Sequence, residues 1–213
     1  MLKNVRVFYK KKSQLKFVSH LDMNRFMTRT IRRTNIPVWY TEGFNCHAYI
    51  TFALPLSLGF ESDYEIMDFK VTNDNYSLEN IKSELIRVMP EFIEIIDVKE
   101  PVLKTGKIAY AEFSIAFEEF SDDIKKDIGD FFSKENIVCI KKNKKGVDKT
   151  VDLKPKIKNY IIDDDKIILT LNAGNDNLNP TLLLSAFEDE FYALPFCAIT
   201  RTKIFDEQLN LFK

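Results

Sequence analysis

The chain has 213 residues, of which 45% are hydrophobic, and its 31 Lys and Arg nearly balance its 32 Asp and Glu. This composition excludes a disordered chain, and no apolar run approaches the roughly 20 residues that a membrane-spanning helix needs. The length suits two domains of about 100 residues each, and the start lacks an apolar leader segment, so we expect a cytoplasmic protein.

Positive charge is concentrated in the first part of the chain. Residues 1–40 hold ten Lys and Arg against one acid, Asp22, and the remaining residues carry a net negative charge. Such asymmetry is typical of a protein with an anionic partner. A second basic stretch, 141–158, holds eight lysines and two aspartates. We interpret its segment Lys141–Gly146 as a solvated hairpin tip, although these lysines could also contact phosphates.

The first half of the chain predicts a βαββαβ order. Val5–Tyr9 alternates as a strand does, and His20–Thr34 has helical apolar spacing, with Ser19 as the N-cap and Asp22 three positions later. A helix is also expected over Leu78–Val88, capped by Ser77. The further expected strands are Val38–Thr41, Tyr49–Leu54, Tyr64–Val71 and Phe92–Val98. This order is the ferredoxin-like arrangement.

The second half predicts a repeat of that element order after a linker at 101–107. The expected helices are Asp122–Phe132, capped by Ser121, and one that starts at Asn179-Pro180. The expected strands are Tyr110–Phe117, Ile137–Lys141, Val151–Ile162, Lys166–Asn172 and Phe196–Ile204. The predicted fold is therefore α+β, with two tandem ferredoxin-like halves that have antiparallel sheets, over residues 1–100 and 108–213.

The segment 19–65 contains both histidines and the only tryptophan of the chain, Trp39. His20 and His47 could meet in space, and with Glu42 or Glu61 they are the candidates for acid–base catalysis. Their spacing matches no metal signature, and Asp22 is explained by helix capping. We therefore assign no metal and expect no cofactor. The sequence also lacks a P-loop, a dinucleotide fingerprint and a nucleophile elbow.

Arginines on the first predicted helix form a candidate anion-binding face. Arg25, Arg29 and Arg32 stand at positions i, i+4 and i+7, so they share one side of the helix. Arg33 and Asn45 complete the candidate set for binding RNA or another anion. The three cysteines, Cys46, Cys139 and Cys197, form no disulfide or metal pattern, and the last two sit in apolar strands where burial is expected.

Several motifs resemble those of the bacterial radical-SAM-linked family, a domain of unknown function. They are Phe17-Val18-Ser19-His20-Leu21-Asp22, Arg32-Arg33, Glu42-Gly43-Phe44-Asn45-x-His47 and Pro55-Leu56-x-Leu58-Gly59-x-Glu61-Ser62-x-x-Glu65. The resemblance covers essentially the whole chain and departs at Cys46 and Ala48, where the family has prolines. In that family the domain is fused to, or encoded beside, a radical SAM protein.

The resemblance implies a companion protein, because this chain lacks the Cys-x-x-x-Cys-x-x-Cys that holds a radical SAM cluster. Our leading hypothesis is an accessory protein, not catalytic alone, that binds RNA or another anionic substrate, or the radical SAM partner itself. One alternative is an RNA-modifying or RNA-processing enzyme that uses the two histidines and a carboxylate. Another is a pure protein-interaction subunit, whose exposed anchors would be Trp39, Tyr40, Phe44 and Phe60.

Overall fold

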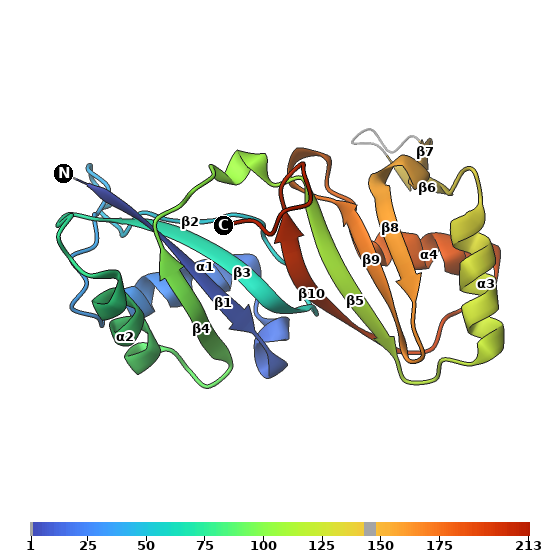
Figure 1. Ribbon diagram of the computed structural model, residues 1–213, viewed down its shortest axis with the longest axis horizontal. Helices are drawn as coiled ribbons and strands as arrows, with labels where there is room; N and C mark the ends of the chain where they lie inside the picture. Colours follow the sequence, from blue (N-terminus) through green and yellow to red (C-terminus); the bar gives the residue numbers. More distant parts are fainter. Residues whose placement is uncertain (1, 143–147) are drawn as a thin grey trace. The chain divides into compact units, whose positions relative to one another are not determined.

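The computed structural model describes residues 2–142 and 148–213, which form an α+β fold with antiparallel strand pairs (Figure 1). The described helices are α1 (His20–Ile31), α2 (Leu78–Val88), α3 (Asp122–Ser133) and α4 (Pro180–Glu190). The described strands are β1 (Lys3–Lys11), β2 (Ile50–Phe52), β3 (Glu61–Val71), β4 (Ile93–Lys99), β5 (Tyr110–Phe117), β6 (Val138–Lys142), β7 (Asp148–Asp152), β8 (Ile157–Ile162), β9 (Lys166–Asn172) and β10 (Cys197–Phe205). The predicted α+β class is confirmed.

The chain divides into two compact units. Unit 1 comprises Met1–Lys107 together with Phe212–Lys213, and unit 2 comprises Ile108–Leu211. In unit 1 the strands follow the order β4-β1-β3, and β2 pairs with the other side of β3. In unit 2 they follow the order β10-β5-β9-β8, while β6 and β7 form a separate hairpin. The tip predicted within Lys141–Gly146 falls largely at 143–146, outside the described residues.

The sheet of unit 1 has one face in the core and one face turned away from the helices. Val5, Val7 and Tyr9 alternate along β1 and are fully buried, and they share their core with Met27 of α1 and Leu85 of α2. Because successive side chains of a strand point to opposite faces, the residues between them lie on the other side of the sheet. Arg6, which lies between Val5 and Val7, is on this other face.

Helix starts follow local rules that the sequence predicts well. Ser19 accepts a hydrogen bond from the Asp22 amide, and Ser121 accepts one from the Ile124 amide. Asn179 caps α4 in the same way, through the Thr181 amide. Ser77 is the exception, because it occupies the N-cap position of α2 without a side-chain cap bond to the described residues. The predicted N-cap position of Ser77 is therefore confirmed, but its side chain makes no cap bond to the described residues.

Several predicted element boundaries are also wrong. Val38–Thr41 is not a strand but contributes only isolated bridges, and the expected strand 151–162 is interrupted by a short 3-10 helix, Lys154–Lys156. Pro155 lies in this interruption and has no amide hydrogen for a strand ladder. Helix α1 ends at Ile31, three residues earlier than expected, where the Thr34 hydroxyl donates to the Ile31 carbonyl.

In unit 2, α3 and α4 bury aromatic side chains. The rings of Phe131 and Phe187 meet edge to face at 5.5 Å, and Phe187 stacks on Phe191 at 4.7 Å. Cys139 is buried as predicted, whereas Cys197 is only half-buried. Across the described ranges, none of the helices is long and apolar enough to cross a membrane.

Candidate functional site

His20 is the first residue of α1, and its ring is held against β2. The imidazole meets the Phe52 ring edge to face, with 5.2 Å between the ring centres. His20 also lines a small pocket of about 10 Å³ together with Lys11 and Glu65. A space of this size holds one water molecule at most. His20 therefore borders a small space that it shares with two charged side chains, and not a substrate cavity.

His47 belongs to a different loop and has its own hydrogen bonds. Its Nδ1 lies 3.0 Å from the Asn45 carbonyl oxygen and 3.2 Å from the Thr41 hydroxyl. The predicted anion ligand Asn45 thus contributes a backbone oxygen that faces the histidine ring. The loop turns at Gly43, whose φ of 114° suits glycine. These contacts fix the ring of His47 within its loop.

The two candidate carboxylates are used differently. Glu61 accepts a hydrogen bond from the Ser13 amide at 3.0 Å and forms an ion pair with Lys12 at 3.7 Å, whereas Glu42 is exposed. In the part of the chain that the structure describes, no cluster of three His, Cys, Asp or Glu could hold a metal ion. That His20 and His47 act together in acid–base catalysis stays a prediction.

Lys11 and Glu65 are buried charged residues that the sequence reasoning did not select. Their exposed fractions are 4% and 5%, and the Lys11 ammonium donates to the Val18 carbonyl at 3.3 Å. Lys11 continues the inward alternation of Val7 and Tyr9 on β1. A charged residue at a core position of a strand is the signal that could have identified it, because an unpaired buried charge is costly.

The predicted arginine face lies on the surface of α1. Arg25, Arg29 and Arg32 are all exposed, while Met23 and Met27 of the same helix are buried. The guanidinium of Arg25 forms an ion pair with Asp22 at 3.2 Å. Hydrogen bonds from Ser19 and then Arg25 hold the pKa of the Asp22 carboxyl below its usual value.

Arg32 and Arg33 have different surroundings, although they are neighbours. The Arg32 guanidinium lies 6.0 Å from the centre of the Tyr40 ring, a cation–π distance. Arg33 instead donates to the Thr30 hydroxyl and to the Val88 carbonyl, so it joins α1 to the end of α2. Arg33 thus has a structural contact that the other three arginines do not share.

The expected aromatic anchors differ in exposure. Phe44 is fully exposed and Tyr40 is 39% exposed, whereas Trp39 is half-buried. Phe60 is only 5% exposed, so its predicted role as a surface anchor is wrong. Phe60 follows Gly59 in a turn closed by a bond from its amide to the Ser57 carbonyl. That turn directs the ring inward.

A large cavity of unit 1 lies on the sheet face that turns away from the helices. It has a volume of about 670 Å³. Its floor includes Asn4 and Arg6 of β1, Asp68 and Lys70 of β3 and Thr51 of β2, and the segment Pro101–Thr105 forms a wall. These residues come from positions far apart in the chain, so no local motif marks the cavity. The sequence reasoning missed it entirely.

Arg6 and Asp68 form a rigid part of this floor. The Arg6 side chain is 1% exposed, and its Nε and Nη2 donate to the two carboxylate oxygens of Asp68 at 2.8 and 2.7 Å. Its Nη1 donates to the Lys213 carbonyl at 3.0 Å, and the guanidinium lies 5.0 Å from the Phe212 ring centre. Each of the three guanidinium nitrogens of Arg6 therefore donates a hydrogen bond to a partner within unit 1.

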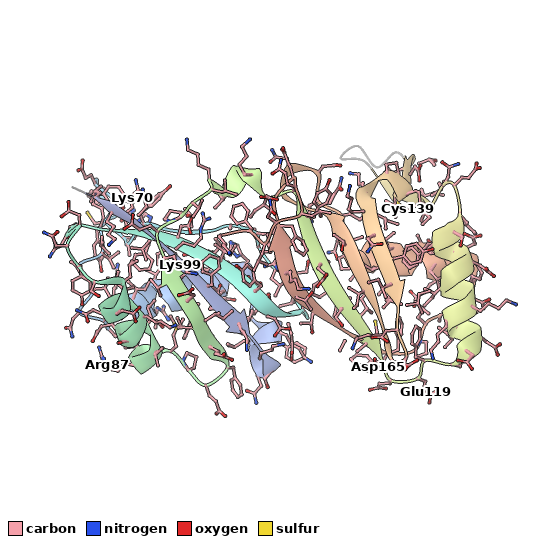
Figure 2. The ribbon with its side chains drawn as sticks, viewed as in Figure 1. Lys70, Arg87, Lys99, Glu119, Cys139 and Asp165 are labelled. Carbon is pink, nitrogen blue, oxygen red and sulfur yellow. The ribbon has the colours of Figure 1, made fainter. Side chains whose placement is uncertain are left out.

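Lys70, labelled in Figure 2, lies at the aromatic side of the cavity. Its ammonium is 5.5 Å from the ring centre of Trp39 and 5.8 Å from that of Tyr49. The two rings meet edge to face, 5.7 Å apart. The cavity therefore has the ammonium group of Lys70 next to the aromatic ring of Tyr49.

A model of the family described as "Uncharacterized protein conserved in bacteria (DUF2344)" matches residues 4–180, which is more than half of the chain. A search of curated proteins finds no match. The matched range includes the arginine face and all of the residues that line the cavity.

Proposed function

We propose a function from the premise that the chain belongs to the DUF2344 family of uncharacterized bacterial proteins. In this proposal the protein is a binding subunit that works beside a radical SAM enzyme and holds RNA, or another anionic substrate, on the exposed face of α1. The observation that carries it is the line of three exposed arginines, Arg25, Arg29 and Arg32, on one side of the helix. The radical SAM partner is inferred from the resemblance of residues 17–65 to the radical-SAM-linked family.

The choice of arginine over lysine favours phosphate binding. The segment 20–33 contains four arginines and no lysine or glutamate, although the whole chain is rich in both. A helix face that only needs solvation commonly carries Glu and Lys in i, i+4 pairs. Guanidinium groups bind phosphate oxygens in a bidentate way and stack on flat rings, which ammonium groups do less well.

The surroundings of the arginines also suit a single-stranded nucleic acid. Tyr40 beneath Arg32 offers a ring on which a base could stack, and Phe44 is fully exposed in the following loop. Proteins that bind single strands combine cationic groups with such aromatic platforms. The ion pair of Arg25 with Asp22 competes with this use at the start of the helix.

The first test measures RNA binding by fluorescence anisotropy with a labelled single-stranded RNA at several salt concentrations. In the variant with Arg25, Arg29 and Arg32 changed to Glu, affinity should fall, and the slope of log K against log salt should become shallower by roughly 2. This magnitude corresponds to three lost phosphate contacts at about 0.7 each.

The matched control changes three exposed lysines outside both basic stretches, Lys107, Lys126 and Lys213, to Glu, so the net charge changes equally. Its slope should stay close to that of the wild type. Equal effects of both triple variants would mean that RNA senses only the net charge, and the arginine face would lose its assigned role. Retained RNA affinity in the arginine variant would contradict the proposal directly.

The second test separates an accessory protein from an enzyme. Co-expression with a radical SAM protein, the partner that the resemblance implies, should give a complex that survives purification, while the isolated chain should neither cleave nor modify RNA. Turnover by the isolated chain that disappears in His20→Ala or His47→Ala, at an unchanged melting temperature, would instead support the enzyme hypothesis. A lowered melting temperature would explain lost activity without a catalytic role.

We also propose that each unit is a ferredoxin-like domain. Unit 1 has the element order βαββαβ and the strand order β4-β1-β3-β2, and unit 2 has the strand order β10-β5-β9-β8 with the hairpin β6-β7 inserted. Both orders place the first strand of the unit between its last and third strands, as this fold does. An experimental structure with a different strand order in either unit would contradict the assignment.

A further inference from the structure

The cavity on the outer sheet face of unit 1 has the size of a small-molecule site. Its volume of about 670 Å³ lies within the range of roughly 300–1,000 Å³ that is usual for ligand pockets. The floor is made of paired strands, since Asn4 lies opposite Lys70 and Arg6 opposite Asp68 in the register of β1 and β3. A floor of paired strands holds its side chains more precisely than a loop would.

The charges that face the cavity favour an anion. The carboxylate of Asp68 is neutralised by Arg6, which uses its Nε and Nη2 on it. The cationic groups that remain are Lys70 and Lys104. Within the described residues neither lysine forms an ion pair, whereas Lys3, Lys10, Lys12 and Lys99 of the same unit all contact carboxylates. The cavity therefore has a net positive charge without an internal counterion.

The remaining lining residues favour a flat ring that carries polar edges. Tyr49 is 41% exposed and is held edge to face by Trp39, so its position is fixed while part of its ring stays open. Asn4, Thr51 and Thr105 supply neutral donors and acceptors. An aromatic platform next to amide and hydroxyl groups is a common way to bind a nucleobase.

We propose that this cavity binds one nucleotide, with its base on Tyr49 and its phosphate between Lys70 and Lys104. The ligand is either a free mononucleotide or the phosphorylated end of an RNA, because both present the same base, sugar and phosphate. The site lies on the sheet face opposite α1, so it goes beyond the arginine face and does not depend on it. Loss of either site leaves the residues of the other unchanged.

Trp39 makes the proposal easy to test, because it is the only tryptophan of the chain and contacts both Tyr49 and Lys70. Adenosine 5′-monophosphate, the first probe, should change the fluorescence of Trp39 in a saturable way, and calorimetry should give the same affinity. Adenosine and ribose 5-phosphate should each bind at least about tenfold more weakly, since each lacks one of the two recognised parts; tenfold corresponds to about 1.4 kcal/mol.

Three variants locate the site. Lys104→Met and Lys70→Met should each weaken binding of the mononucleotide by at least about tenfold, because a hydrogen bond to a charged group is lost. Lys107→Met is the matched control, since Lys107 is exposed in the same segment but does not line the cavity. Lys104 lies on the exposed wall, so its removal tests binding even if Lys70→Met lowers the stability of unit 1.

A comparison of ligands identifies the source of the nucleotide. In the variant with Arg25, Arg29 and Arg32 changed to Glu, tighter binding of a 5′-phosphorylated tetranucleotide than of the mononucleotide would assign the site to an RNA end, and the reverse would assign it to a free nucleotide. The proposal is overturned if the wild type shows no saturable binding of either ligand by calorimetry. It is equally overturned if Lys104→Met and Lys107→Met bind the mononucleotide with the same affinity as the wild type.

Discussion

Replacement of Arg6 by Met should destabilise unit 1 strongly, because it would leave Asp68 without its partner at the floor of the cavity. The Arg6 side chain is 1% exposed and donates three hydrogen bonds, two to Asp68 and one to the Lys213 carbonyl. Methionine fills a similar volume without a charge. The change therefore tests the electrostatic contribution more than the packing.

The size of the effect follows from the burial of the two partners. Removal of one member of a fully buried ion pair costs about 3–5 kcal/mol. Asp68 keeps 21% of its side-chain exposure, so water can solvate it in part after the change. We therefore expect a loss near the lower limit, about 3 kcal/mol of unfolding free energy. The double variant Arg6→Met, Asp68→Met should recover about half of this loss, because it leaves no unpaired charge.

Urea unfolding followed by Trp39 fluorescence measures this free energy for unit 1, because the tryptophan lies in that unit. Lys10→Met on the same strand is the control. Lys10 forms an exposed pair with Glu94, which should contribute at most about 1 kcal/mol. If Arg6→Met loses no more than Lys10→Met, or if the double variant is less stable than the single one, the reasoning is wrong.

Two further predictions compare matched positions. Ser19→Ala should lower the unfolding free energy of unit 1 by about 1 kcal/mol, whereas Ser77→Ala should change it little. Of these two serines, Ser19 caps its helix with its side chain and Ser77 does not. Equal losses in urea unfolding would contradict this reasoning. Gly174→Ala should destabilise unit 2 by more than 1 kcal/mol, roughly the cost of a strained backbone, because Gly174 has a φ of 69° and an added Cβ would lie 2.8 Å from the Ile108 carbonyl oxygen. Gly106→Ala, where an added Cβ meets no atom within 4 Å, should be close to neutral, and thermal melts followed by circular dichroism should show a lower transition only for Gly174→Ala.

The features that the sequence predicted correctly are those that depend only on residues close together in the chain. The Ser19 and Asn179 caps are confirmed, because a helix N-cap needs only the amide groups two or three positions later. Val38–Thr41 looked like a strand from its composition, yet a strand needs a partner that the local sequence does not reveal. Phe60 was expected to be a surface anchor, yet its burial depends on contacts that the local sequence does not reveal.

The candidate site was predicted only in part. The arginine face follows from helical spacing alone, and the exposure of Arg25, Arg29 and Arg32 agrees with it. The cavity combines residues from Asn4 to Thr105, so only the folded chain brings them together. Nothing in the sequence distinguishes its two lysines, Lys70 and Lys104, from the other basic residues among the 31 of the chain.

The bond from Arg6 to the Lys213 carbonyl joins residues that are 207 positions apart. During synthesis, Arg6 leaves the ribosome early, while the carbonyl that completes its contacts is made only after the whole of unit 2. At about 5–20 residues per second, this interval lasts about 10–40 s. Throughout that time the Arg6 side chain has one hydrogen-bond acceptor fewer than in folded unit 1. Unit 1 therefore reaches its full stability only after unit 2 has been translated.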